Sequence, residues 1–118
     1  MNKFYEYSGD LMGLPTDDNH INFRWNNPDC KILFSICRQG NGVCGHFASD
    51  KKGLRKLKVA MKEMIKFVFN KYDWCEMIFA KVKTELKSVK RLDEAVGFKF
   101  LLKDGDIDYY YYPRGEAL

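Results

Sequence analysis

The amino-acid sequence predicts a single α/β domain in which a mixed, mostly antiparallel sheet carries one long basic helix and one short helix on its faces. Three observations lead to this prediction. Apolar runs of strand length recur along the chain, two connections between them have hairpin-turn sequences, and two stretches repeat apolar residues at the helical period. A chain of 118 residues supports one hydrophobic core, so we expect residues 1–118 to form one domain.

The first thirty residues predict a short and divergent start to this domain. Residues 2–7 have the composition of a short strand, and residues 8–19 are rich in turn formers, which predicts a loop or a short helical turn. Residues 21–25 alternate apolar and polar side chains, as a half-buried strand does, and the Asn-Asn-Pro-Asp sequence that follows indicates a turn.

A β-hairpin is predicted next. Two β-rich runs, residues 31–38 and 43–48, flank a Gln-Gly-Asn-Gly turn. Cys44 and His46 on the second run are two residues apart, so their side chains share one face of the strand. Such a pair could provide a nucleophile and base or two metal ligands, but with no third partner in the pattern we prefer structural packing and predict no metal site.

The stretch from His46 to Tyr72 is the segment around which the chain is organised: a strand end, a basic turn and a long amphipathic helix. Its apolar residues recur every three or four positions and predict one buried stripe. The stripe consists of Leu54, Leu57, Met61, Met64, Ile65, Val68 and Tyr72. The other face is cationic, with Lys52, Arg55, Lys56, Lys58, Lys62, Lys66 and Lys71. An anion would bind at the first turn, where backbone N–H groups lack partners, while the helix body could simply be a solvated face.

The C-terminal part predicts a strand, a short helix and a second hairpin. The strand covers residues 74–82, and the helix covers residues 85–96 and ends at a glycine cap. We expect this short helix on the side of the sheet opposite the long one. Residues 98–102 and 107–112 form the hairpin around an Asp-Gly turn, and alternate members of its four-tyrosine run face opposite sides.

Composition and charge exclude several classes of protein. The sequence contains no long apolar run and no apolar leader at its start, which predicts a cytoplasmic protein with no membrane segment. The four cysteines form no C-x-x-C pair, so we expect reduced, mostly buried thiols. The net charge of +4 divides into 4 − 6 = −2 for residues 1–50 and 16 − 10 = +6 for residues 51–118. No helix-turn-helix, zinc-finger or RNA-recognition signature accompanies the basic part, so we expect no sequence-specific nucleic-acid binding, and only non-specific phosphate contact stays open.

Residues 31–112 resemble the GNAT acetyltransferase superfamily. The resemblance rests on the order strand, basic turn, long helix, strand, short helix, Gly-Phe and hairpin, and its most specific part is residues 78–98, IFAKVKTELKSVKRLDEAVGF. It implies binding of acetyl-CoA and transfer of an acetyl group to an amine. By position it implies that Phe47, Ala48 and Ser49 contact the pantetheine arm, and that Lys52, Gly53, Leu54, Arg55 and Lys56 contact the pyrophosphate.

The sequence also departs from the family pattern. Only Gly53 remains of the small residues of the phosphate loop, and Leu86 and Asp93 occupy the positions where the family often has an Asn and a Tyr that acts as general acid. The catalytic residues are therefore unknown, and four candidates for the general base stay open: Glu6, Asp29, His46 and Glu76.

These departures favour a second hypothesis. Small GNAT-like chains with a lysine-rich helix are similar to proteins encoded by tailed bacteriophages. That resemblance implies a catalytically degenerate protein with a structural, assembly or internal-virion binding role. Its partners would be phage structural proteins in place of an amine substrate, and it would reside in the host cytoplasm or the virion.

Overall fold

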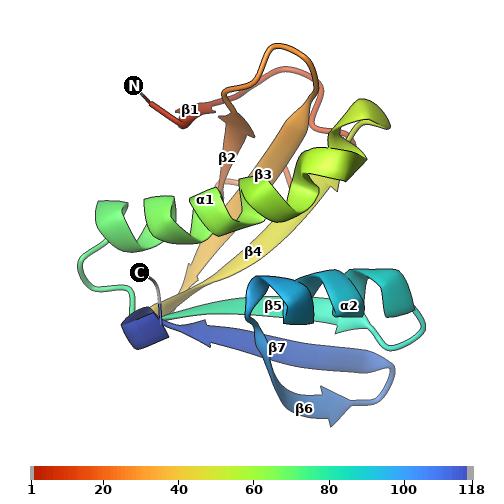
Figure 1. Cartoon of the computed structure of the whole chain (residues 1–118). Coiled ribbons are helices and arrows are strands. Elements are labelled where there is room, and N and C mark those ends of the chain that lie inside the picture. Colours follow the sequence, from red (N-terminus) through yellow and green to blue (C-terminus); the bar gives the residue numbers. More distant parts are fainter. Residues whose placement is uncertain (1, 117–118) are drawn as a thin grey trace.

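The computed structural model describes residues 2–116, which form one seven-stranded sheet with two helices (Figure 1). The strand order is β1-β2-β3-β4-β5-β7-β6, and every neighbouring pair is antiparallel except β4 and β5. The strands are β1 (Phe4–Glu6), β2 (His20–Trp25), β3 (Ile32–Gln39), β4 (Gly42–Ser49), β5 (Met77–Lys83), β6 (Lys99–Asp104) and β7 (Ile107–Pro113). The predicted fold class, a mixed and mostly antiparallel sheet, is confirmed.

The predicted hairpins form where the turn residues favour them. Gly40 between β3 and β4 has φ 60°, and Gly105 between β6 and β7 has φ 62°, a region that glycine enters without steric cost. The tyrosine run alternates as predicted. Tyr110 is 1% exposed and Tyr112 packs on Phe98 on the helix side of the sheet.

The long helix begins later than the apolar pattern predicts. Residues Lys52–Lys56 form a 3₁₀ turn, η1, and the α-helix α1 covers Leu57–Lys71. The predicted stripe from Leu57 to Val68 is buried against the sheet. Leu54 was wrongly included in that stripe, because a 3₁₀ turn has three residues per turn and leaves this side chain 60% exposed.

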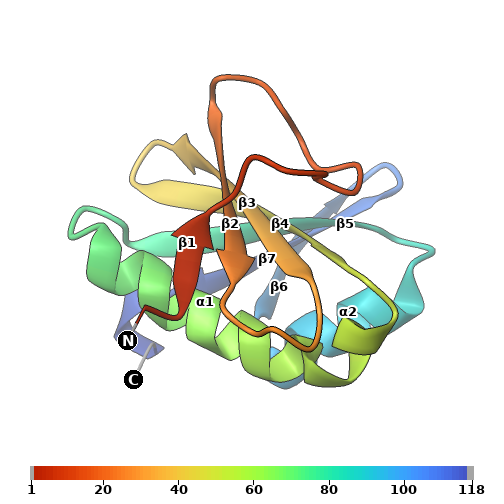
Figure 2. The same ribbon diagram turned by 90° about the horizontal axis from the view of Figure 1, so that it is seen from above.

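Both helices lie on the same face of the sheet, so the expectation of opposite sides is wrong (Figure 2). The short helix α2 covers Lys87–Val96, and it contacts α1 over the diverging strands β4 and β5. The helix α2 and the turn before it are joined to β7 by Asp108, which accepts hydrogen bonds from Lys90 at 2.9 Å and Thr84 at 2.7 Å. One hydrophobic core therefore lies between the sheet and both helices.

The opposite face, called here the outer face, is covered in part by the loop of residues 7–19 (Figure 2). Leu14 of this loop is buried, and Asn22 Nδ2 donates a hydrogen bond to the Pro15 carbonyl oxygen at 3.3 Å. The loop thereby shields Leu33 and Ser35 of β3, both 0% exposed. Over residues 2–116, neither helix is long and apolar enough to cross a membrane.

Candidate functional site

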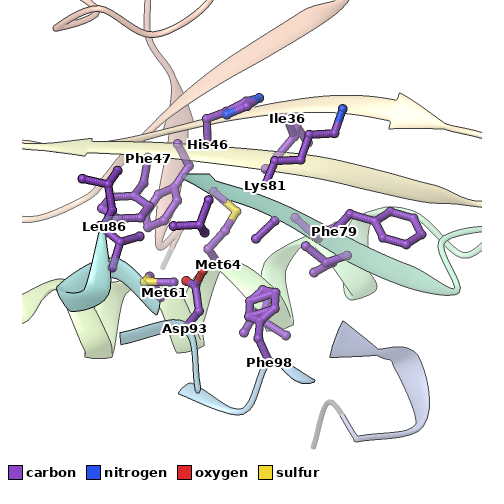
Figure 3. Close-up of a pocket in the computed structure, with 18 of the residues that line it drawn as sticks. Ile36, His46, Phe47, Met61, Met64, Phe79, Lys81, Leu86, Asp93 and Phe98 are labelled. Carbon is purple, nitrogen blue, oxygen red and sulfur yellow. The ribbon is translucent and has the colours of Figure 1, made fainter. Parts of the chain in front are cut away.

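A cavity opens where β4 and β5 diverge. The two strands pair only from Gly42 to Cys44 with Met77 to Phe79, and beyond this point no ladder joins them. A cavity of about 510 Å³ lies in the gap, with α1 and α2 closing it on the helix side (Figure 3). Its wall is mainly apolar and includes Phe34, Ile36, Phe47, Met61, Met64, Ile65, Val68, Ile78, Val82, Leu86, Val89 and Phe98. A concave, largely apolar site with a few polar groups is the usual form of a small-molecule site.

Asp93 is the most unusual polar group of this cavity. Its side chain extends from α2 into the cavity (Figure 3), the residue is 1% exposed, and Oδ2 has no hydrogen-bond partner within residues 2–116. Burial, with a smaller effect of the Glu94 charge, raises the pKa of Asp93 to about 7. The carboxyl is therefore largely protonated below neutral pH and can donate a proton into the cavity.

His46 lies on β4 at the edge of the cavity, and its ring points away from Asp93, toward the outer face (Figure 3). Burial lowers its pKa below the usual value, and the positive charges of His20 and Lys81 lower it further. The imidazole is therefore neutral near pH 7 and can accept a proton. The cavity thus holds a proton donor and a proton acceptor whose environments move their pKa values in opposite directions, the arrangement that acid–base catalysis uses.

Among the four candidates for the base, His46 lies at the cavity and the other three do not line it. Glu6 is on the edge strand β1, where its charge acts on Tyr72. Asp29 is near Lys56, with 3.9 Å between carboxylate and ammonium. Glu76 is exposed and precedes β5.

The residues predicted for the pantetheine arm lie on β4, and only part of them reach the cavity. Phe47 lines it. Ala48 is in register with Leu33, so it belongs to the outer face, and the Ser49 hydroxyl donates to the Asp50 carbonyl oxygen at 2.8 Å.

The residues predicted for the pyrophosphate form an exposed basic turn around a buried glycine. Lys52, Leu54 and Arg55 are exposed, and the Gly53 N–H donates to Asp50 Oδ1 at 2.8 Å. A Cβ atom at Gly53 would lie 2.7 Å from Ile32 Cγ1 and would also clash with Ser49 Oγ. Packing therefore requires this glycine, whatever the turn binds.

The Cys44 and His46 pair forms no metal site in the structure. No group of three or more potential metal ligands occurs within residues 2–116, and all four cysteines are free thiols. Burial raises the pKa of the Cys44 thiol, which keeps it protonated and unreactive as a nucleophile.

Asp93 received no role in the sequence-based prediction, although a signal was present. Asp93 occupies an otherwise apolar face of the short helix, between Val89 and Val96 at spacings of four and three residues. A carboxyl in the apolar stripe of an amphipathic helix is an exception that calls for a functional explanation.

No protein-family model and no curated protein sequence matches the chain. The chain is, however, similar to several solved structures. The N-acetyltransferase PseH of Campylobacter jejuni in complex with acetyl coenzyme A is similar over 83% of this chain and 70% of its own, with a TM-score of 0.70 and 18% identity. A chimera of the spermidine N-acetyltransferase SpeG from Vibrio cholerae with hSSAT is similar over 86% and 70%, with a TM-score of 0.72 and 13% identity.

A dodecameric spermidine N-acetyltransferase from Vibrio cholerae, in an intermediate state, is similar over 86% of this chain and 69% of its own, with a TM-score of 0.67 and 14% identity. At such low identity these likenesses concern the arrangement of the backbone. The chain has the fold of the GNAT N-acetyltransferases, as its sequence predicted.

Proposed function

We propose that this protein binds acetyl-CoA and transfers its acetyl group to an amine, with His46 as the general base and Asp93 as the general acid. The observation that carries this proposal is the pair itself: two titratable groups line one cavity, Asp93 from the helix side and His46 from the outer face, and burial favours the neutral form of each. The similar structures support it as well, because one is in complex with acetyl coenzyme A and others are spermidine N-acetyltransferases.

The residues present fit such a cofactor in the cavity. The apolar walls formed by α1, α2 and β5 suit an extended, uncharged chain, and the unpaired Asp93 Oδ2 has a proton to offer and lacks a partner. When bound, acetyl-CoA supplies an acetyl group activated as a thioester. We assign Phe47, Ala48 and Ser49 to the arm and Lys52, Gly53, Leu54, Arg55 and Lys56 to the pyrophosphate.

Each residue then has a defined task. The His46 ring nitrogen accepts a proton from the acceptor amine, which increases its nucleophilicity. Asp93 Oδ2 donates its proton toward the leaving sulfur, so that no free thiolate need form in an apolar cavity. The apolar side chains from α1 exclude water, which protects the thioester from hydrolysis.

Asp50 favours the alternative function, a catalytically degenerate protein with a structural or assembly role in a phage. Its carboxylate already occupies the Gly53 N–H, and its negative charge opposes a diphosphate at the same place. In this alternative the basic turn contacts a protein partner, and the cavity is a remnant of an ancestral site.

Calorimetric titration with acetyl-CoA separates the two functions. Acetyl transfer predicts saturable binding, and it predicts release of free thiol with at least one amine of a panel that includes spermidine. Absence of binding by the native protein would refute the enzyme proposal. Binding without transfer to any amine would favour the degenerate protein.

A matched pair of double variants tests the basic turn. Lys52→Glu with Arg55→Glu should weaken acetyl-CoA binding about tenfold or more, because two cations near the diphosphate are reversed. Lys62→Glu with Lys66→Glu makes the same change in charge on the exposed side of α1 and should have a much smaller effect. Equal effects of the two pairs on acetyl-CoA affinity would show that only net charge matters.

His46→Gln should leave acetyl-CoA binding intact and slow acetyl transfer by about a hundredfold or more.

A further inference from the structure

A row of polar side chains that includes His46 crosses the outer face. Asn22, Ser35 and His46 are lateral neighbours in register on β2, β3 and β4, and their side chains lie on the same face. Ser35 is 0% exposed, Asn22 is partly buried, and the buried atoms Ser35 Oγ and Asn22 Oδ1 have no hydrogen-bond partner within residues 2–116. Buried polar atoms of this kind require a partner, and a water molecule held between them would satisfy both.

His20 lies beside this row, in the next row of the outer face, where it pairs with Cys37. It is two residues before Asn22 on β2 and therefore shares the outer face, and its ring centroid is 5.8 Å from that of His46. The ring is tied to the loop at its other side, because His20 Nδ1 lies 2.8 Å from Asp17 Oδ1. This hydrogen bond lowers the pKa of Asp17, which is consequently ionised.

The contact with Asp17 fixes the tautomer of His20. A carboxylate only accepts hydrogen bonds, so His20 Nδ1 must carry the hydrogen. In the neutral ring the other nitrogen, Nε2, is then an unprotonated acceptor. The side chain of His20 is 15% exposed and that of Asp17 is 57% exposed, so this pair also reaches the solvent.

We propose that His46, His20 and Asp17 form a proton path that leads from the cavity to the solvent across the outer face. In this path His20 acts through His46: it receives the proton from His46 and holds it beside Asp17. The path goes beyond the proposed function, and it rests on that function for the role of His46.

The transfer is balanced at every atom. The acceptor amine loses one N–H bond, and His46 gains one at one of its two ring nitrogens. The other nitrogen of His46 then releases a proton to His20 Nε2, directly or through a water molecule bound between Ser35 Oγ and Asn22 Oδ1. The His20 imidazolium that results is stabilised by the Asp17 carboxylate and gives up the proton to bulk water.

The remaining groups around His46 cannot replace His20 as acceptor. Lys81 on β5 acts on His46 through its positive charge, and an ammonium group has no free acceptor site. Cys37 and Cys44 occupy the next row of the outer face, and burial raises the pKa of the Cys44 thiol. Ser35 is uncharged and serves only as a hydrogen-bonding bridge.

The free protein tests the path without any assay of activity. Nuclear magnetic resonance of protein labelled with ¹⁵N at histidine reports the tautomer and the titration of each ring. We expect His20 in the Nδ1–H form, and we expect His20→Asn to raise the pKa of His46, because the positive charge of His20 no longer opposes it. Asn retains a donor to Asp17 near the Nδ1 position but cannot accept the proton.

Two further variants separate the path from general effects of the loop. Asp17→Ala removes the acceptor and should abolish the preference of His20 for the Nδ1–H form. Asp18→Ala makes the same change at the neighbouring exposed residue and should change neither ring. Identical titration of His46 in the native protein and in His20→Asn, or an Nε2–H tautomer of native His20, would refute the path.

Steady-state kinetics provide the second measurement. His20→Asn and Asp17→Asn should lower kcat about tenfold with little change in the KM for acetyl-CoA, because proton removal slows while binding is unaffected. Acetyl transfer at the native rate by the His20→Asn variant would contradict the path and leave the proposed function standing. Absence of acetyl transfer by the native protein would contradict the proposed function. The titration of the two histidines would then test only whether their rings are coupled.

Discussion

The Asp50 carboxylate accepts a hydrogen bond from the Gly53 N–H at 2.8 Å, at the turn where the sequence predicted contact with a diphosphate. Its second oxygen accepts a hydrogen bond from the Lys31 N–H at 3.0 Å, which joins the helix start to β3. Asp50 therefore stabilises the turn and competes with an anion for the same amide.

Asp50→Asn is predicted to tighten acetyl-CoA binding several-fold and to lower the free energy of unfolding. The affinity rises because a negative charge is removed from the anion site, while the stability falls by about 1–2 kcal/mol because charged hydrogen bonds to two amides become neutral ones. Calorimetry and urea unfolding measure the two effects. Asp29→Asn is the control, since Asp29 is also close to the turn but lies 3.9 Å from Lys56 and makes no hydrogen bond to Gly53. Unchanged affinity in Asp50→Asn would exclude Gly53 from the anion site.

The acid–base pair predicts a narrow pH optimum for acetyl transfer. His46 must be neutral, and its lowered pKa places the acidic limb of kcat/KM below the usual histidine range. Asp93 must be protonated, so kcat/KM should fall again as pH rises through about 7. A profile that rises steadily to pH 9 would exclude Asp93 as the acid. In Asp93→Asn the alkaline limb should disappear and the maximum rate should be lower.

Asp93 also predicts an unusual dependence of stability on pH. Its folded-state pKa of about 7 exceeds the ordinary aspartate value of 3.8, so the native state binds the proton more tightly than the unfolded state. The contribution of Asp93 to stability is therefore most favourable at low pH, and it declines as pH rises between these two values. Asn is neutral at every pH, so Asp93→Asn should be close to native stability at about pH 4 and more stable, by an amount on the order of a few kcal/mol, at pH 8. Urea unfolding at both pH values measures this, and a pH-independent difference would contradict the assignment of the buried charge.

Local sequence patterns predicted most elements of the fold because they reflect local physics. Each of these signals acts over a few neighbouring residues. Examples are the glycines at the turns between β3 and β4 and between β6 and β7, and the apolar period of α1. The start of α1 was less predictable, since the 3₁₀ turn around Gly53 depends on Asp50 and on packing against Ile32 of another strand.

The candidate site was predicted only in part, because it depends on contacts between distant elements. The sequence identified the end of β4 and named His46 among four possible bases. It did not place Asp93 opposite His46, since this requires α2 to lie on the same face of the sheet as α1. The row of Asn22, Ser35 and His46 depends on the register of three strands, which no short motif encodes.

Arg114 is predicted to be the main polar contributor to the stability of the C-terminal end of α1. Its guanidinium donates to the carbonyl oxygens of Phe69 at 3.0 Å, Tyr72 at 2.6 Å and Cys75 at 2.7 Å, which lie in the last turn of α1 and in the segment that follows it. Arg114→Met should lower the free energy of unfolding by about 2–3 kcal/mol, and Arg114→Lys should recover only part of this loss because an ammonium group cannot reproduce the planar array of donors. Arg91→Met, on the exposed side of α2, makes the same change in charge and should shift the urea midpoint little. Equal midpoints for Arg114→Met and Arg91→Met would show that these hydrogen bonds add nothing beyond those the carbonyl groups make with water. The 3₁₀ turn η2 (Arg114–Glu116) would then be held to α1 by the packing of Arg114 on Phe69 alone.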